Sequence, residues 1–265
     1  MENRLVRKIK EARRRRRKLF CAFLTLGYPD LRTTEKLIAG FEAEGVDLVE
    51  VGFPFSDPLA DGPTIQYSSE RALGRGVTLQ DALRMAGRLR KRGVGIPLIF
   101  FSYLNPIFHA GEKEFPKRLK AAGFDGLIVP DCPPEEDRPL WKATRRSGLS
   151  PIFLIAPTTT ERRARKIFAS SRGFIYYVAL RGVTGARPSL ARDLRSNLRR
   201  LRRLGPKPLL VGFGISSPAQ VRQAARLGDG VIVGSAIVER IRRSGGKVPR
   251  ILSFVGSLVR SLRGA

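Results

Sequence analysis

Short apolar runs alternate with longer amphipathic segments along this chain of 265 residues. The runs are hydrophobic throughout, which is typical of strands buried on both faces, and the longer segments repeat their apolar positions every three to four residues, as helices do. The runs predict strands at residues 19–26, 46–51, 96–102, 125–129, 150–155, 173–179, 207–212 and 230–233. The amphipathic segments predict helices at residues 32–44, 78–92, 112–122, 134–147, 160–170, 190–203, 217–227 and 247–262.

Eight strands, each followed by a helix, predict an α/β fold whose parallel strands close into a (β/α)8 TIM barrel. An open doubly wound sheet is the alternative, but no G-x-G-x-x-G fingerprint follows the first strand. A basic helix is predicted at residues 2–17, and an extra short helix at residues 64–73 after the second strand. We therefore expect one domain, 1–265, in which residues 1–18 precede a barrel at 19–262.

The chain carries a formal net charge of +27, which points toward nucleic acid on electrostatic grounds. Outside residues 13–18, however, the basic residues recur singly or in pairs at helical spacing, as expected for solvated outer faces. No RNP-type aromatic segment or zinc-finger spacing accompanies them. We expect no specific nucleic-acid function. We do expect weak non-specific polyanion binding. A protein whose function is polyanion binding is the alternative, and its binding would collapse with added salt.

Cysteine and histidine are scarce, which limits the available chemistry. Cys21 and Cys132 cannot build a disulfide framework or a four-ligand zinc site, and the single histidine, His109, excludes sites that need two. No apolar run approaches the ~20 residues of a membrane span, and the N-terminal segment lacks a small-residue cleavage site. We expect a cytoplasmic protein that holds no metal and enters no membrane.

The most informative stretch joins the second predicted strand to the short helix after it. Glu50 lies between valines at the end of that strand, where an unpartnered carboxylate is costly or becomes neutral. Asp57 and Asp61 follow on a loop stiffened by prolines, and a rigid loop with spaced acids suits general acid–base catalysis. The alternative is that Glu50 faces solvent at a strand edge while the aspartates only initiate turns.

Polar residues that follow successive strands of a barrel meet on one rim, at the carboxyl ends of the strands. Here they are Glu50, Tyr103, Asn105, Asp131 and residues 158–160, with Tyr176 inside the sixth strand. Several also have a structural interpretation. Tyr176 could belong to the core, Asn105 to a turn before proline, and the threonines at 158–160 to a helix cap.

Glycines in three neighbouring loops indicate a bound anion. They lie at residues 182–185 after the sixth strand, 212–214 after the seventh and 234 after the eighth, where a short helical segment begins. Barrels hold phosphate with the bare backbone N–H groups of these last loops and with an extra helix N-terminus. Strand termination alone explains one such cluster easily and three adjacent clusters poorly. The glycines therefore predict a phosphorylated substrate.

The acidic stretch is also where the chain resembles a known family. Glu50, Pro-Phe-Ser-Asp-Pro at 54–58 and Ala-Asp-Gly-Pro at 60–63 followed by Ile65 and Gln66 resemble the signature of the tryptophan synthase alpha subunit family, the indole-glycerol-phosphate lyases. The resemblance covers roughly residues 19 to 240. Further similar segments, in the family's order, are residues 23–29, 126–131, 134–136, 156–159, 182–185, 211–216 and 234–238.

The resemblance implies a retro-aldol cleavage of indole-3-glycerol phosphate to indole and glyceraldehyde 3-phosphate, in tryptophan biosynthesis. On the matching positions, Glu50 is the general acid/base, Asp61 accepts the indole N–H, and Tyr176 lies beside the glutamate. Thr184 on the sixth loop would order Asp61 when that loop closes. The resemblance places phosphate on Gly185, Gly214, Gly234 and Ser235, and the indole ring against Phe23, Leu59, Ile65, Leu127 and Phe213.

The resemblance also implies a partner. The family works as the α part of an αββα complex that passes indole to a pyridoxal-phosphate β subunit, so we expect that partner and no cofactor in this chain. Asp57 and Pro58 match one contact region, and Asn105 with Pro106 matches another. Two alternatives stay open. One is a non-catalytic activator of a β subunit, which the presence of both acids disfavours, and the other is a stand-alone lyase that releases indole.

Two features depart from the family pattern. Ala179 stands where the family usually has serine and is followed by Leu180 and Arg181, so loop closure and phosphate contacts are expected to differ. The strong basicity also differs from near-neutral members, and it reflects either arginine-rich codon bias or attraction of an anionic substrate. Neither departure removes a catalytic carboxylate.

Overall fold

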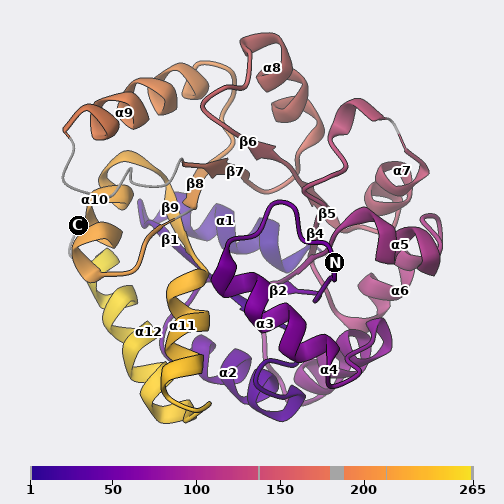
Figure 1. Ribbon diagram of the computed structural model, residues 1–265. Helices are drawn as coiled ribbons and strands as arrows, with labels where there is room; N and C mark the ends of the chain where they lie inside the picture. Colours follow the sequence, from indigo (N-terminus) through magenta and orange to yellow (C-terminus); the bar gives the residue numbers. More distant parts are fainter. Residues whose placement is uncertain (1, 137, 180–187, 213, 264–265) are drawn as a thin grey trace.

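The computed structural model shows a ring of strands inside an outer layer of helices (Figure 1). It describes residues 2–136, 138–179, 188–212 and 214–263. The strands are β1 (Leu19–Thr25), β2 (Leu48–Gly52), β3 (Leu98–Phe101), β4 (Gly126–Ile128), β5 (Ser150–Ile152), β6 (Leu154–Ile155), β7 (Ile175–Val178), β8 (Leu209–Gly212) and β9 (Gly230–Val233). The helices are α1 (Arg4–Arg14), α2 (Leu31–Ala43), α3 (Pro63–Leu73), α4 (Leu79–Lys91), α5 (Leu104–Ala110), α6 (Phe115–Ala122), the 3-10 turn η1 (Pro134–Glu136), α7 (Pro139–Arg146), α8 (Glu161–Ser170), α9 (Pro188–Arg202), α10 (Pro218–Leu227), α11 (Ser235–Arg243) and α12 (Val248–Arg263).

All strand pairs in the described chain are parallel, in the order β5-β4-β3-β2-β1-β9-β8-β7-β6. The first and last strands of this order are consecutive in the chain and only Phe153 separates them. β5 pairs with β4 and β6 pairs with β7, so this short segment crosses between its two neighbours and brings the ring to near closure. The predicted TIM barrel is confirmed, with the predicted fifth strand divided in two.

The barrel interior is apolar, and α1 closes one end of it. One apolar cluster draws on alternate residues of strands all around the ring, so it must fill the inside of the ring. Leu5, Ile9 and Ala12 of α1 belong to the same cluster, and in Figure 1 this helix lies behind the strands. The side-chain amide of Asn3 donates to the carbonyls of Asp125 and Gly148 at 2.7 and 2.8 Å, which holds the helix in place. The predicted N-terminal helix is therefore a plug.

Aspartates repeat one contact at the N-terminal ends of the strands. Asp47, Asp125 and Asp229 stand directly before β2, β4 and β9. Each accepts a backbone N–H from the start of the neighbouring strand and pairs with an arginine, so each ties two strands and a charged side chain together. The N–H donors are Phe20, Leu98 and Leu209, at 2.9, 3.2 and 2.9 Å. The arginines are Arg17, Arg90 and Arg202, at 2.7, 2.9 and 3.2 Å.

The outer helices follow the predicted pattern except after β3 and β4. The pattern predicts no helix at residues 104–110, yet α5 forms there because both carboxylate oxygens of Asp131 accept the Leu104 N–H at 3.0 and 3.2 Å. Gly111, at φ +89°, ends α5 and separates it from α6. The helix predicted at 134–147 shortens to η1 and α7, since Pro139 begins α7. The extra helix α3 is confirmed.

Replacing Asp125 tests the strength of these rim contacts. We expect Asp125→Asn to lower the free energy of unfolding by about 3 kcal/mol, because the largely buried Arg90 would lose its counter-charge. The matched change Asp229→Asn should cost about 1 kcal/mol or less, since both members of the Asp229–Arg202 pair are substantially exposed. Urea denaturation measures both values. Equal losses would contradict the role given to burial.

Candidate active site

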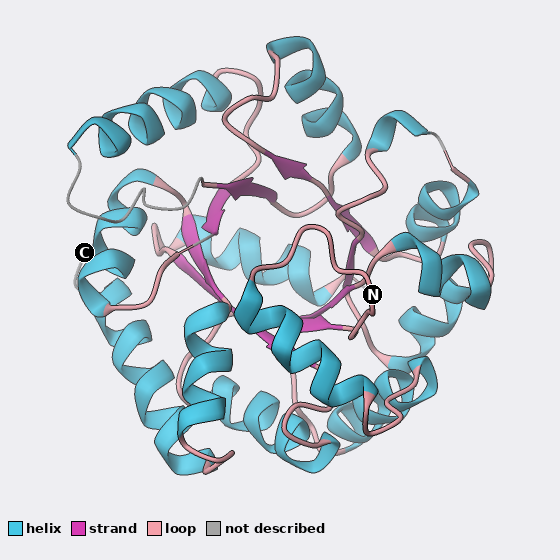
Figure 2. Cartoon of the chain, viewed as in Figure 1, coloured by secondary structure: helices cyan, strands magenta, loops and turns pink. Residues whose placement is uncertain are grey.

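A cavity of about 230 Å³ lies at the carboxyl ends of the strands, at the opposite end of the barrel from α1. Figure 2 shows the loop between β2 and α3 arching over this end. The strand residues that line the cavity are Phe23, Glu50, Phe101, Leu154, Tyr176, Val178 and Ile232. Loops after the strands complete it, so side chains far apart in the sequence face one space.

Glu50 is the third residue of β2 and is 1 % exposed. Neither of its carboxyl oxygens has a hydrogen-bond partner among the described residues. Burial raises the pKa of Glu50 to about 8, against a smaller lowering by the thiol of Cys21 on β1. A carboxyl group in this state is mostly protonated near neutral pH and close to its midpoint. It can therefore give a proton and take one back within one reaction cycle.

Asp61 lines the same cavity from the loop before α3. Its N–H donates to the Pro58 carbonyl at 3.0 Å, and the Tyr103 hydroxyl accepts the neighbouring Ala60 N–H at 2.9 Å, so the loop is tied to the rim. Burial raises the pKa of Asp61 to about 6, and a hydrogen bond with Tyr103 acts in the opposite direction. Two carboxyl groups with raised pKa values in one cavity are typical of a catalytic site.

Tyr176 also faces the cavity, from the middle of β7. Burial raises its pKa well above the usual range, and the charge of Glu50 raises it further, so the hydroxyl stays protonated. A Cβ atom on Gly212 of the next strand would come within 2.6 Å of the Tyr176 hydroxyl oxygen. Only glycine leaves room for the tyrosine here. Tyr176 therefore belongs to the interior core and to the cavity wall at the same time.

The described residues predicted to hold phosphate lie on another part of the cavity wall, and we call them the anion cradle. Gly214, Gly234 and Ser235 all line the cavity, and Gly214 has a φ of +71°, which favours glycine. α11 begins at Ser235 with Gly234 as its N-cap, so the first N–H groups of the helix open toward the cavity. The predicted site residues Thr184, Gly185 and Phe213 lie outside the described residues.

The predicted indole pocket is only partly assembled as expected. Phe23 and Ile65 line the cavity, and Phe23 meets Phe101 edge to face with ring centres 5.8 Å apart. Leu59 is 95 % exposed on the outside of its loop. Leu127 is fully buried, but in the apolar layer between strands and helices, because its neighbour Ile128 takes the inward position on β4. Neither Leu59 nor Leu127 lines the cavity.

Several cavity residues were missed by sequence reasoning, although a signal for some was present. Inward positions on a strand are two residues apart, so Phe101 shares the face of Ile99, and Val178 that of Tyr176. The position of Glu50 on β2 could have indicated which alternate residues of the strands face inward. Tyr103, which the sequence places on the same rim, forms a hydrogen bond with Asp61. The structural interpretation of the threonines is confirmed, since Thr160 caps α8.

The described residues were also searched for metal ligands and for membrane-spanning helices. Within that part of the chain, no three histidine, cysteine, aspartate or glutamate side chains gather as a metal site would require. None of the described helices combines the length and the apolar character needed to cross a membrane.

Comparison with known proteins identifies the family. Residues 9–255 match the family model described as "Tryptophan synthase alpha chain". The tryptophan synthase alpha chain of Dehalococcoides mccartyi is 44 % identical over 247 residues, covering 93 % of this chain and 96 % of the relative. That of Geotalea daltonii is 48 % identical over 232 residues, covering 88 % of each. This chain belongs to the tryptophan synthase alpha chain family.

Solved structures of the family share the whole fold. The tryptophan synthase subunit alpha of Legionella pneumophila superimposes with a TM-score of 0.93 at 32 % identity and covers 100 % of both chains. A chain from the tryptophan synthase of M. tuberculosis, in its aminoacrylate-bound form, gives a TM-score of 0.87 at 32 % identity, covering 98 % of this chain and 100 % of the other. The resemblance to the family seen in the sequence is confirmed.

The buried acid makes stability depend on pH in a definite direction. Below pH 4.5 Glu50 is neutral in both the folded and the unfolded chain, and between pH 4.5 and about 8 the unfolded chain loses this proton first. The folded wild type should therefore lose stability relative to Glu50→Gln across that interval, by on the order of 3–5 kcal/mol, with no further change above it.

Urea denaturation at a series of pH values from 5 to about 9 measures this difference. The control is Glu114→Gln, which changes an exposed carboxylate paired with Lys117 at 3.1 Å. It should alter the free energy of unfolding by less than about 0.5 kcal/mol at every pH. A Glu50→Gln difference that is independent of pH would contradict the raised pKa of Glu50.

Proposed function

We propose that this chain cleaves indole-3-glycerol phosphate to indole and glyceraldehyde 3-phosphate by a retro-aldol reaction, as the alpha subunit of tryptophan synthase. Family membership supports the reaction. The observation that carries the assignment of its residues is that one cavity holds two carboxyl groups with raised pKa values, Glu50 and Asp61, and also the N-terminus of α11. Proton transfer and phosphate binding are the two requirements of this substrate.

Glu50 is the general acid and base of the proposed mechanism. The scissile bond joins the indole ring carbon to a carbon that bears a hydroxyl group. Protonated Glu50 gives its proton to the ring carbon, and the resulting carboxylate then takes the hydroxyl proton. The O–H electrons form the aldehyde, the C–C bond electrons return to the ring, and Glu50 ends protonated again. A pKa of about 8 lets one group perform both transfers.

Asp61 stabilises the intermediate between these two transfers. Protonation of the ring carbon leaves a positive charge that spreads to the ring nitrogen, and an ionised carboxylate that accepts the indole N–H opposes it. The pKa of Asp61, at about 6, leaves this group mainly ionised at neutral pH while Glu50 remains mainly protonated. Their environments thus separate two chemically similar groups into an acid and an anion.

The rest of the cavity orients the substrate. Phe23, Ile65 and Phe101 present apolar surface to the indole ring, and Tyr176 completes the wall beside Glu50. The N-terminus of α11 and the hydroxyl of Ser235 would hold the phosphate, because a helix N-terminus favours anions. An apolar wall displaces water from the intermediate and strengthens both electrostatic contacts.

The proposed reaction needs only proton transfers, so we place no cofactor in this chain and assign pyridoxal phosphate to a partner β subunit. The loop that carries Asp61 also offers a surface for that partner. Phe55, Asp57, Pro58 and the exposed Leu59 line an open groove along α3. An apolar side chain this exposed is typical of an interaction surface. Two buried free cysteines fit a reducing, cytoplasmic location.

Indole release from the substrate tests the catalytic roles. Glu50→Gln should lower kcat by at least ~10²-fold, because both proton transfers lose their carrier. Asp61→Asn should lower it by ~10²–10³-fold, because the cationic intermediate loses its counter-charge. Glu114→Gln serves as the control and should turn over like the wild type. Retained activity in both site variants would contradict the roles given to Glu50 and Asp61, whereas no cleavage by the wild type would leave only an activator of the β subunit.

Mixing the chain with a tryptophan synthase β subunit tests the partner surface. We expect cleavage turnover to rise on mixing, and Leu59→Asp to weaken this stimulation at least tenfold, because it places a charge on the exposed apolar contact. The activity of the isolated Leu59→Asp variant should not change, since Leu59 does not line the cavity. Unchanged turnover on mixing would favour a stand-alone lyase.

A further inference from the structure

A second cavity lies at the opposite end of the barrel from the active site. It measures about 540 Å³ and lies where the end of α1 and the linker to β1 face the loop between α9 and β8. Leu19, the first residue of β1, and Pro208, directly before β8, line it. In the described part of the chain, it shares no residue with the catalytic cavity.

This cavity carries a large excess of positive charge. One wall contributes Lys10, Arg13, Arg16, Arg17 and Lys18. The other wall contributes Arg202 and Lys207. Of the described residues that line it, Asp229 alone is acidic, and its carboxylate already accepts the Leu209 N–H at 2.9 Å and pairs with Arg202 at 3.2 Å. Seven cations therefore face one carboxylate that the fold already uses.

Much of this positive charge is not neutralised, because several of the cationic side chains have only uncharged partners, or none, among the described residues. Lys18 donates to the Gly228 carbonyl at 2.7 Å, and Lys207 donates to the Phe168 carbonyl. Arg13 and Arg16 are exposed, and their side chains form no hydrogen bond or ion pair with another described residue. Burial lowers the pKa of Lys18 and of Lys207. Lys10 and Arg17 do have acidic partners, Glu2 and Asp47, outside the cavity lining.

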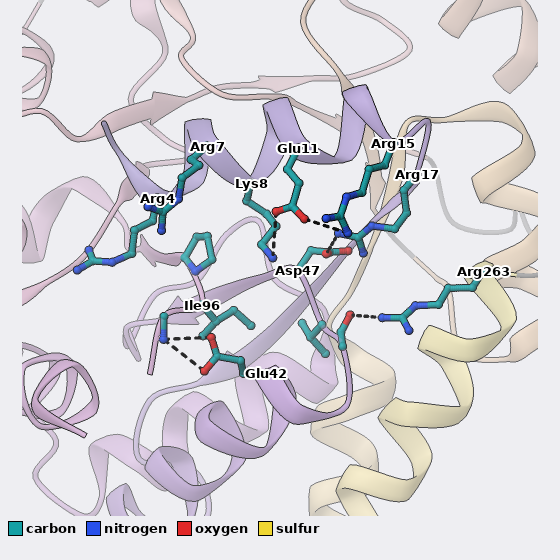
Figure 3. A pocket seen from close by; sticks show the side chains of 14 residues that line it. Arg4, Arg7, Lys8, Glu11, Arg15, Arg17, Glu42, Asp47, Ile96 and Arg263 are labelled. Atoms are coloured by element: carbon teal, nitrogen blue, oxygen red, sulfur yellow. Dashed lines mark hydrogen bonds and ion pairs between the residues drawn. The ribbon is translucent and has the colours of Figure 1, made fainter. Parts of the chain in front are cut away.

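The neighbouring pocket on the other side of α1 has a smaller excess of positive charge. Figure 3 shows Glu11 between Lys8 and Arg15, at 3.9 and 3.4 Å, and Asp47 facing Arg17 at 2.7 Å. Three carboxylates there are interleaved with six cations among the described lining residues. Lys8, Arg15 and Arg17 thus each face a carboxylate that lines the same pocket. In the 540 Å³ cavity, Asp229 is the one carboxylate among the described lining residues.

We propose that the cavity between α1 and the α9–β8 loop binds anions that carry several linked phosphate groups, whether as inorganic tripolyphosphate or as the phosphate chain of a nucleoside triphosphate. Guanidinium and ammonium groups on two facing walls match an anion whose charge extends along a short chain, because a single phosphate reaches only some of them. Within the described lining no aromatic ring offers a base a stacking surface, so the phosphates are what is recognised.

Arg16 offers a way to remove charge without loosening the fold. α1 ends with the Arg17 N–H donating to the Ala12 carbonyl at 2.8 Å and the Arg16 N–H to the Arg13 carbonyl at 3.1 Å, and Arg16 has a φ of +50°. This is the left-handed position that glycine usually takes at such a helix end. Arg16→Gly should therefore preserve the turn while it removes one cation from the cavity.

Calorimetric titration with tripolyphosphate tests the proposal. It is performed on the full chain at low salt, with saturating glycerol 3-phosphate present to occupy the anion cradle of α11. We expect Arg16→Gly to weaken binding about fivefold and the double variant Arg13→Gln with Arg16→Gly about 30-fold. The matched control is Arg75→Gly, an exposed arginine in the turn after α3 that lines neither cavity. It should stay within about twofold of the wild type.

The ligand series decides the chemical class. ATP should bind within about threefold of tripolyphosphate, and orthophosphate at least tenfold more weakly, since it engages fewer cations. No wild-type binding, or equal losses in Arg16→Gly and Arg75→Gly, would overturn the proposal. It would also be overturned by a single-stranded oligonucleotide that binds more tightly than tripolyphosphate and is weakened equally by Arg16→Gly, because the cavity would then be a nucleic-acid site.

Discussion

The burial of the Glu50 carboxyl group is the constraint that the rest of the barrel has to accommodate. An uncompensated carboxylate is unstable in an apolar interior, so burial favours the protonated form of this group. That state requires an interior closed to water. α1 provides the closure at one end, where Leu5 and Ile9 pack beneath the strands. The catalytic potential of Glu50 is thus a property of the whole ring.

The acids at the two ends of the barrel have different surroundings. At the N-terminal ends of the strands, aspartates such as Asp47 and Asp125 meet arginines and backbone N–H groups, so their charges are matched and the strands are tied together. At the carboxyl ends, Glu50 pairs with no cation among the described residues and has only the Cys21 thiol beside it, and Asp61 has Tyr103. Both ends carry buried acids. The presence or absence of a matched cation separates the acids that tie strands together from the acids whose pKa values are raised.

The net charge of +27 acquires meaning only when the positions of its groups are known. Many arginines on the outer helices pair with a nearby acid, as Arg165 does with Glu161 and Arg243 with Glu239, and such surface pairs contribute little beyond solubility. The run at residues 13–18 is different, because the end of α1 directs part of it into a cavity with little acidic compensation. Basic residues that look alike in the sequence therefore lie in different electrostatic surroundings in the folded chain.

The sequence by itself determined the alternation of buried strands and amphipathic helices, the short helix α3, and the acids of the β2 loop. These are local features, since hydrophobic periodicity and proline or glycine punctuation act over a few residues. Only the tertiary structure decided that Asp131 would induce α5, that the fifth strand would divide to close the ring, and that Leu127 would face outward while Ile128 faces inward. Each depends on contacts between segments distant in the chain, which no local pattern contains.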